Sequence, residues 1–372
     1  MKATRFPLGS TFGFSDAEIN PQVTVPGYDH PDLDQIQDLR EKQVASFLKG
    51  NVPPVNTDYV FRKDLIRELN FWYTQTSGDV LCLWGPTGSG KTSLANQFLA
   101  RLGVPVFHLK GHKKMELIEA FGHYVAGPNG QTIFNYGPVT NAARFGGVVV
   151  INEYDRIQAS TAVAFNDVFE GGEFAIPGKH GETIRPRPGF RIVITANTNL
   201  VEDVSGLYQT ASTHDISLLE RLYSIRIDYP DEEAERKVVS NAIARYDDKL
   251  LSYWFDQEEM KLVTKHGEKH GAAISRDEFI QGIIEVAHKI RKQSRDGGND
   301  DDSALERTMS TRIIAKWASY SVGMCGAATN LGLSALHYAM RKCLSDFATE
   351  STRIALHQAV EEVFGVGATI KP

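Results

Sequence analysis

A glycine-rich run beginning near residue 84 holds the residues best suited to chemistry. The run WGPTGSGKTS places Gly85, Gly90, Lys91 and Thr92 in the spacing G-x-x-x-x-G-K-[ST]. It follows the apolar stretch VLCLW, a predicted strand, and precedes SLANQFLARL, a predicted helix. Glycines allow backbone N–H groups to turn inward around phosphate oxygens, and a helix start adds positive potential. We therefore predict a phosphate-binding loop in which Lys91 reaches the outer phosphates and the Thr92 hydroxyl ligates Mg²⁺.

A second group of polar residues ends the buried stretch VVVINEYD. A phosphate loop of this kind needs a metal-holding acid and a water-activating acid on a neighbouring strand. Glu153 is predicted to polarise the attacking water. Asn152 stands where Asp usually holds Mg²⁺ through bound water, so the metal position is predicted to be uncharged. Asp155 is close in sequence, but its direction along the strand end is left open. Two outcomes remain: slowed ATP hydrolysis, or nucleotide binding with negligible turnover.

Three more polar residues occur where strands end or helices begin and end. FRIVITANTN ends a predicted strand with Asn197, which is expected between the attacking water and the γ-phosphate. DISLLERLYSIRIDYP places Arg221 after a helix, where it can reach a neighbouring subunit's γ-phosphate and stabilise transition-state charge. MSTRIIAKW places Arg312 at a helix start, and it is expected to reach back over the nucleotide. The plain alternatives are a turn asparagine, a surface ion pair and an ordinary helix-start arginine.

These residues define the predicted site. Glu153, Lys91, Asn197 and Arg221 are the expected catalytic residues, and Thr92 and Asn152 are expected to hold the metal. The residues expected to bind the nucleotide are Gly85, Pro86, Thr87, Gly88, Ser89, Gly90, Lys91, Thr92, Ser93 and Arg312. The predicted cofactors are ATP and Mg²⁺.

The elements that must position these residues change character along the chain. Residues 1–55 are rich in Pro, Gly and Asp and are predicted to form an N-terminal extension. Residues 56–230 alternate strand-like and helix-like runs, which predicts a parallel sheet with helices on both faces. Residues 231–372 are predicted to form a helical domain with a C-terminal tail. In DEFIQGIIEVAHKIRKQ the apolar residues share one helical face, namely Phe279, Ile280, Ile283, Ile284, Ala287 and Ile290.

Composition restricts the class of protein. The 40 basic and 46 acidic residues leave a formal net charge of -6, which gives no global attraction to nucleic acid or anionic lipid. The three cysteines form no zinc pattern and fit a reducing cytoplasm. The N-terminus lacks an apolar signal segment, and the apolar runs are too short to span a bilayer. We expect a cytoplasmic protein without membrane or nucleic-acid partners.

Two segments look like hairpin insertions. HYVAGPNGQTIFNYGP has a turn between short strand-like runs, and FAIPGKHGETIRPRPGFR is basic. The basic residues of the second are Lys179, His180, Arg185, Arg187 and Arg191. They are expected either to grip an acidic partner or nucleic acid, or to form a solvated hairpin. Tyr59 and Phe61 precede the first strand, and either flank the adenine or pack in the core.

The order of these motifs resembles that of the AAA+ ATPases. The stretch GPVTNAARFGGVVVINEYDRIQASTAVAFNDVFEGGEFAIPG resembles the MoxR branch. The most specific resemblance is to the CobS subunits of aerobic cobaltochelatases, through VPGYDHP, TDYVFRKD, NEYDR, IRPRPGFRIVITANTN, GLYQTAS and LLERLYSIRIDY. It covers roughly residues 12–231, weakens across the helical domain and is not seen in roughly the last forty residues. The chain departs from the family at Asn152, where the family has Asp.

The resemblance implies an α/β P-loop AAA+ core, a parallel sheet flanked by helices, followed by a helical lid. It also implies an ATP-driven ring, usually a hexamer, in which Arg221 acts in trans, and a partner with a von Willebrand A-type domain. Three functions follow: remodelling of a partner protein, a motor subunit of a cobaltochelatase, or a nucleotide-gated scaffold with little turnover. No residue cluster suits cobalt, so chelation chemistry would lie in a partner. A helicase role is disfavoured because no aromatic-basic stacking surface occurs.

Overall fold

The computed structural model describes residues 4–75, 78–179, 181–201, 216–246, 262–263, 269–270, 275–296, 308–331 and 333–365. These residues form two compact units. The second unit comprises Thr87–Ser89 and the described residues from Tyr229 onward, and the first contains the described residues up to Asp228 apart from those three. Among the described residues, the helices are all too short or too polar to cross a membrane.

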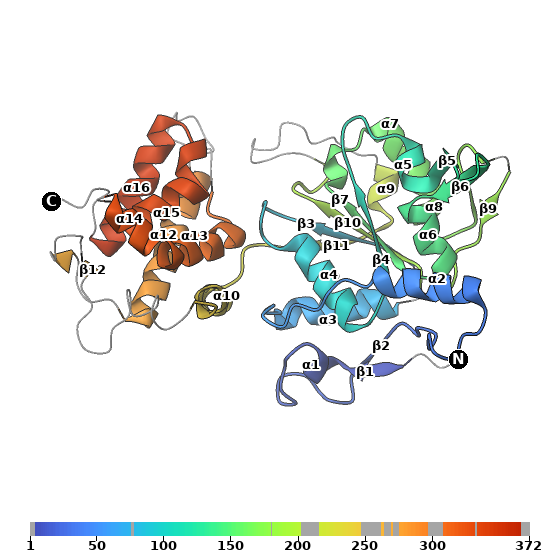
Figure 1. The fold of residues 1–372 in the computed structure, drawn as a ribbon, viewed down its shortest axis with the longest axis horizontal. Coiled ribbons are helices and arrows are strands. Elements are labelled where there is room, and N and C mark those ends of the chain that lie inside the picture. Colours follow the sequence, from blue (N-terminus) through green and yellow to red (C-terminus); the bar gives the residue numbers. More distant parts are fainter. Residues whose placement is uncertain are drawn as a thin grey trace. The chain divides into compact units, whose positions relative to one another are not determined.

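Five strands form the main sheet of the first unit, in the order β11-β3-β10-β7-β4. Their bounds are β3 (Val80–Trp84), β4 (Val106–Lys110), β7 (Val148–Asn152), β10 (Arg191–Ala196) and β11 (Leu222–Arg226). Every pairing is parallel, with Trp84 opposite Ala196 and Arg226, and Asn152 opposite Lys110. The residues that follow these strands therefore meet along one edge of the sheet (Figure 1).

Helices cover both faces of this sheet (Figure 1). The helices of the first unit are α1 (Leu8–Thr11), α2 (Leu39–Gly50), α3 (Lys63–Thr74), α4 (Lys91–Arg101), α5 (Leu117–Phe121), α6 (Pro138–Phe145), η1 (Tyr154–Arg156), α7 (Ala159–Ala162), η2 (Val163–Phe165), α8 (Asn166–Phe169) and α9 (Ile216–Leu219). Leu81 and Leu83 of β3 pack with α3 and α4, whereas Val80 and Cys82 pack in the core that contains α6 and α8. The alternation confirms the predicted sheet flanked by helices.

The N-terminal residues belong to the first unit. Strands β1 (Arg5–Pro7) and β2 (Thr24–Pro26) pair antiparallel. Phe12 stacks on Phe98 of α4, with ring centroids 5.1 Å apart, and Val25 is fully buried in the same core. The segment from β1 to β2 is therefore anchored to the α3–α4 side of the sheet, whereas Leu48 of α2 is buried in the core that contains α6.

Both predicted hairpins are present in the first unit. Strands β5 (Gly122–Ala126) and β6 (Thr132–Tyr136) pair antiparallel, as do the two-residue strands β8 (Phe174–Ala175) and β9 (Thr183–Ile184). His180 lies outside the described residues, as does the GLYQTAS stretch, residues 206–212.

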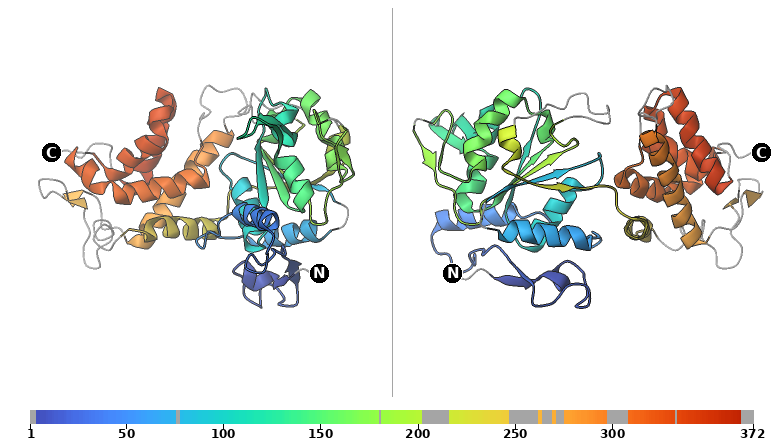
Figure 2. Two further views of the ribbon diagram at one scale, coloured as in Figure 1. Left: turned by 45° about the vertical axis from the view of Figure 1, so that its right-hand side comes forward. Right: turned by 180° about the vertical axis from the view of Figure 1, so that it is seen from behind.

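The second unit is mainly helical. Its elements are α10 (Glu232–Ala244), β12 (Leu262–Val263), β13 (Lys269–His270), α12 (Arg276–Asp296), α13 (Thr311–Gly323), α14 (Cys325–Asn330), α15 (Ala335–Cys343), η3 (Ser345–Phe347) and α16 (Glu350–Phe364). The six α12 residues expected to share a face are all buried, in a core that also holds Trp317. Helix α13 packs against α10 and α15, among the yellow to red helices of Figure 2.

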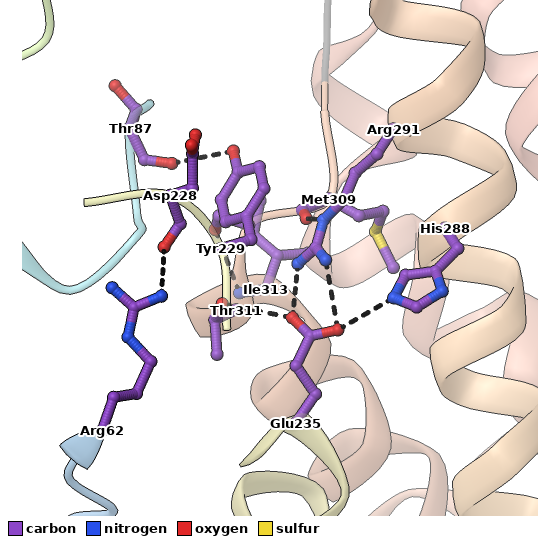
Figure 3. Close-up of polar contacts among 11 residues, drawn as sticks. Arg62, Thr87, Asp228, Tyr229, Glu235, His288, Arg291, Met309, Thr311 and Ile313 are labelled. Atoms are coloured by element: carbon purple, nitrogen blue, oxygen red, sulfur yellow. Dashed lines mark hydrogen bonds and ion pairs between the residues drawn. The ribbon is translucent and has the colours of Figure 1, made fainter. Parts of the chain in front are cut away.

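A buried ion pair joins three helices of this unit (Figure 3). Arg291 of α12 donates two hydrogen bonds to the carboxylate of Glu235 on α10, at 2.7 and 3.1 Å, and a third to the carbonyl of Met309. Thr311, at the start of α13, donates to the same carboxylate over 3.4 Å, and His288 lies 3.3 Å from it. Since the Glu235 side chain is fully buried, these partners replace the water that it loses.

Candidate functional site

The predicted phosphate loop joins the end of β3 to the start of α4. Gly85 has φ +141°, and a Cβ there would lie 2.3 Å from the carbonyl oxygen of Ile227, so only glycine fits. Gly90 has φ +95° and directly precedes α4, where an added Cβ would meet no atom within 4 Å. The loop is therefore a tight turn that leads into the N-terminus of α4, and the space beside Gly90 is open. Thr92 and Ser93 follow in the first turn of α4, and Ser93 is exposed.

Lys91 is directed toward its own loop and the end of β10. Its ammonium donates to the carbonyl oxygens of Gly85 and Pro86, at 2.7 and 2.9 Å, and to Oδ1 of Asn197 at 3.0 Å. The residue is only 8% exposed, so the charge is held at the inner side of the loop. The structure thus brings together two of the predicted residues, Lys91 and Asn197, from positions 106 residues apart.

The side-chain amide of Asn152 contacts Thr92 and Thr195 through its oxygen and His108 through its nitrogen. Its Oδ1 accepts a hydrogen bond from Thr92 Oγ1 at 2.7 Å and a longer one from Thr195 Oγ1 at 3.4 Å. Its Nδ2 lies 3.5 Å from Nδ1 of His108, whose pKa is lowered by burial. The two predicted metal residues are therefore in direct contact, through oxygen atoms.

Glu153 occupies an unusual backbone conformation directly after β7. Its φ of +56° is in the left-handed region, which for a residue other than glycine costs about 1–3 kcal/mol and is frequent at functional sites. Its N–H donates to Thr195 Oγ1 at 3.3 Å, and its carboxylate lies 3.0 Å from the guanidinium of Arg156. A Cβ at Gly111 would lie 2.5 Å from the Glu153 carbonyl oxygen, so the residue that follows β4 also constrains this turn.

Asp155 is a buried carboxylate that holds the backbone of Asn197. It is 1% exposed, and its Oδ2 accepts a hydrogen bond from the backbone N–H of Asn197 at 2.8 Å. Burial raises the pKa of the Asp155 carboxyl, while hydrogen bonds from the backbone of Asn197 and Thr198 and the charges of Lys91 and Arg156 oppose that change. The carboxylate thus anchors the end of β10, which carries Asn197.

Three supporting residues, Asp155, Thr195 and His108, were not predicted as site residues. Thr195 lies near the carboxyl end of β10 and Asp155 shortly after that of β7, whereas His108 lies in the middle of β4. Thr195 lies two residues before Asn197, so the two side chains point to the same side of the strand. That position at a strand end was the available signal. The contacts themselves depend on the strand order, which brings β4, β7 and β10 together.

Arg221 lies in another cluster of the first unit, and Arg312 belongs to the second unit. Arg221 follows α9, and its guanidinium bonds the carbonyl of Ser217 and the carboxylate of Glu170. Arg312 is the second residue of α13 in the second unit, and it is exposed. The side chain of Ser310 caps that helix by accepting from the N–H of Ile313, which confirms the predicted helix start.

Of the two aromatic residues proposed to flank the adenine, Phe61 packs in the core. It is 8% exposed, with the rings of Tyr59 and Phe12 at 4.7 and 5.1 Å and the guanidinium of Arg101 at 4.6 Å over its face. Of the two interpretations of this pair, the structure therefore favours core packing for Phe61.

Cations of the basic hairpin have partners inside the first unit. Lys179 bonds Tyr136 and Glu182, and Arg185 lies 3.5 Å from Glu173. Arg191 donates to the carbonyl oxygens of Phe190 and Gln75, at 2.9 and 2.8 Å. Lys179 and Arg191 are therefore bonded within the fold, whereas the Arg185 side chain is 86% exposed.

The site suits a nucleotide with Mg²⁺. The open turn at Gly90 and the N-terminus of the 11-residue helix α4 form a cradle for phosphate oxygens. Thr92 and Asn152 offer hard oxygen atoms, which Mg²⁺ prefers, usually together with waters and substrate phosphates. The described residues contain no cluster of three or more His, Cys, Asp or Glu side chains that could hold a metal without such help.

Comparison with known proteins gives two domain matches. Residues 80–210 match an AAA domain of the dynein-related subfamily, and residues 269–363 match the CbbQ/NirQ/NorQ C-terminal domain. The first match contains the phosphate loop, Asn152, Glu153 and Asn197, and the second contains Arg312. The α/β unit and the helical unit therefore each have a family counterpart.

Three relatives show how far the likeness extends. The chain is 27% identical to the denitrification regulatory protein NirQ of Stutzerimonas stutzeri over 157 residues, which are 42% of this chain and 54% of NirQ. It is 24% identical to protein NorQ of Paracoccus denitrificans over 283 residues, 76% of this chain and 86% of NorQ. It is 27% identical to protein CbbQ of Hydrogenophilus thermoluteolus over 162 residues, 43% of this chain and 57% of CbbQ. The matches to NirQ and CbbQ thus span little more than half of those proteins.

Proposed function

We propose that this chain, a MoxR-type AAA+ ATPase by its AAA domain and its CbbQ/NirQ/NorQ C-terminal domain, hydrolyses ATP to remodel a partner protein. One observation carries the proposal of hydrolysis. Glu153 is held in a left-handed backbone conformation at the strand end that also bears Asn152, whose amide contacts Thr92 of the phosphate loop. Residues held in such strained conformations cluster at functional sites.

In this proposal each predicted residue at the carboxyl edge of the sheet has a defined role in ATP hydrolysis. Glu153 would take the proton of the attacking water, and Asn197 would orient that water beside the γ-phosphate. Lys91, now bonded to Asn197 and the loop, would transfer its hydrogen bonds to the outer phosphates. Thr92 and Asn152 would hold Mg²⁺, which when bound neutralises phosphate charge.

Steady-state phosphate release by the purified chain tests this proposal, with Glu153→Gln as the matched control. The amide keeps the shape of the side chain but cannot accept the proton, so turnover is expected to fall by about 100-fold or more. ATP binding by the variant should persist. If the wild-type chain binds ATP but turns it over no faster than Glu153→Gln, the protein is a nucleotide-gated scaffold and the proposal of hydrolysis fails.

The resemblance noted in the sequence also supports finer proposals. We propose that copies of the chain form a ring, a hexamer in related ATPases, and that the remodelled complex includes a von Willebrand A-type protein. We place this activity in the cytoplasm, because the three cysteines Cys82, Cys325 and Cys343 are all buried as thiols. A cobaltochelatase motor is the second candidate, favoured by the VPGYDHP and TDYVFRKD segments. The C-terminal match to the CbbQ/NirQ/NorQ proteins favours the first candidate.

A further inference from the structure

Asn152 is an uncharged residue at the predicted metal position, and its amide can point in either of two orientations. A carboxylate has two equivalent oxygens, whereas an amide has one acceptor oxygen and one donor nitrogen. If the Asn152 amide were reversed, its N–H₂ group would face Thr92 and any cation beside it. An asparagine can therefore serve here only if neighbouring groups fix which atom faces the loop.

The structure contains such groups on the oxygen side. The Thr195 hydroxyl accepts a hydrogen bond from the Glu153 N–H at 3.3 Å and has a single proton to donate. That proton is directed at Asn152 Oδ1, 3.4 Å away. Thr195 is 3% exposed, so water does not offer its hydroxyl an easy alternative. The hydrogen bonds from Glu153 to Thr195 and from Thr195 to Asn152 therefore suit an acceptor oxygen at this position of Asn152.

A complementary group stands on the nitrogen side. Nδ1 of His108, in the middle of β4, lies 3.5 Å from Asn152 Nδ2. A neutral imidazole nitrogen without a proton accepts from an amide N–H but not from an amide oxygen. With the His108 proton on Nε2, both long contacts agree with the orientation in which Oδ1 accepts the 2.7 Å hydrogen bond from Thr92.

We propose that Thr195 and His108 are positioning residues, which hold the Asn152 amide with its oxygen toward Thr92 and so allow a neutral side chain to support a bound Mg²⁺–nucleotide. The inference rests on the proposed nucleotide function and deepens it. The inference predicts that the effect of Thr195 and His108 depends on the residue type at position 152. The two residues matter only while residue 152 is an amide, because either oxygen of an aspartate serves equally well.

Binding of the non-hydrolysable ATP analogue AMP-PNP tests this dependence without any reaction. Calorimetry gives its dissociation constant in Mg²⁺ and in EDTA, and the ratio of the two is the magnesium gain. Thr195→Val and His108→Leu are each expected to lower the gain by roughly three- to tenfold, the effect of one neutral hydrogen bond. Thr195→Ser, which retains the hydroxyl, should keep the wild-type gain. In the Asn152→Asp background, neither Thr195→Val nor His108→Leu should change it.

The outcomes separate the inference from the function on which it rests. Equal losses in the Asn152 and Asn152→Asp backgrounds would show a general structural role and overturn the inference, as would unchanged gains in the wild-type background. A wild-type chain that binds AMP-PNP without any magnesium gain also overturns it, while nucleotide binding stands. A wild-type chain that does not bind AMP-PNP removes the proposed function and the inference together. Should Thr195→Val fail to fold, His108→Leu, at a position that is only partly buried, answers the same question.

Discussion

Asp155 and Asn197 show how a single buried carboxylate can organise a site through a backbone hydrogen bond. The hydrogen bond from the Asn197 N–H to Asp155 crosses from β10 to the turn after β7. It fixes the backbone of the residue whose side chain contacts Lys91. The carboxylate is buried, and that burial raises its pKa. Its role is therefore to hold the backbone of Asn197 rather than to carry charge at the surface.

Replacement of Asp155 by alanine is therefore expected to destabilise the first unit. It leaves the Asn197 N–H without its acceptor, and an unsatisfied buried donor costs about 1–3 kcal/mol. Asp155→Asn is the matched control, because its amide oxygen can accept the same bond. Urea denaturation should show a lower free energy of unfolding for Asp155→Ala than for Asp155→Asn. Equal values for the two variants would contradict the role of the hydrogen bond.

At the residue scale, the geometry of the predicted turn is confirmed where the relevant spacing is local. The pattern from Gly85 to Thr92 lies between a strand and a helix, and the structure shows that turn. Asp155, Thr195 and His108 escaped prediction because their contacts join residues 42 to 44 positions apart. Those contacts exist only because β10 and β4 both lie beside β7, and neighbouring letters in the sequence do not specify that order.

At the level of elements, patterns of apolar residues were sufficient for the sheet and both hairpins. Short runs such as VLCLW and GVVVI contain strands buried on two faces, and they form β3 and β7. The buried links between helices were not visible, because Glu235 and Arg291 lie 56 residues apart in stretches that look merely amphipathic. Polar residues on a predicted helix are normally assigned to solvent, so a buried pair requires the structure.

The Glu235–Arg291 pair gives a prediction for the second unit. Glu235→Ala leaves the Arg291 guanidinium buried without its counter-ion, and loss of one partner of such a pair costs about 3–5 kcal/mol. Because the free energy of unfolding falls, hydrogen exchange of the α10 and α12 backbone amides should become faster in Glu235→Ala than in the wild-type chain. The double variant Glu235→Leu/Arg291→Met should be less damaging than Glu235→Ala, since it leaves no unpaired charge. Slower exchange in Glu235→Ala than in the double variant would refute this account.

A histidine pair between α15 and α16 predicts pH dependence for the same unit. His357 Nδ1 lies 2.7 Å from His337 Nδ1, and Ser345 Oγ lies 3.0 Å from His357 Nε2. Burial lowers the pKa of His357 to about 4, helped by His337, Arg341 and Arg353 and opposed by Asp346. The unfolded chain therefore binds a proton near pH 6.5, whereas the folded chain does so only near pH 4.

The sign of the effect follows from that order of pKa values. The stabilising contribution of neutral His357 is complete above pH 6.5 and is lost as the pH falls from there toward 4. Calorimetric melting of the second unit should thus show a lower Tm at pH 5 than at pH 7. His357→Gln, which does not titrate, should reduce the difference between the two pH values. An unchanged difference in the variant would assign the pH dependence to other groups.

The whole molecule joins the AAA domain to a C-terminal domain, and one copy does not collect every predicted catalytic group in one cluster. Lys91, Thr92, Asn152, Glu153 and Asn197 meet at one edge of the sheet. Arg221 is instead bonded to Glu170 and to the carbonyl of Ser217. An arginine in a separate, partly exposed cluster can complete the site of another copy, which is the arrangement proposed here for the ring.

Mixing two inactive variants tests whether Arg221 acts between copies. Arg221→Ala retains Glu153 but lacks the arginine, and Glu153→Gln retains the arginine but lacks the base, so each alone should have little turnover. In an equal mixture about a quarter of the sites would combine an intact Glu153 with an intact neighbouring Arg221, and that fraction of the wild-type rate should return. The control mixes Arg221→Ala with the Arg221→Ala/Glu153→Gln double variant, which supplies no arginine. A first mixture that stays as inactive as this control would place the action of Arg221 within its own copy, or outside catalysis.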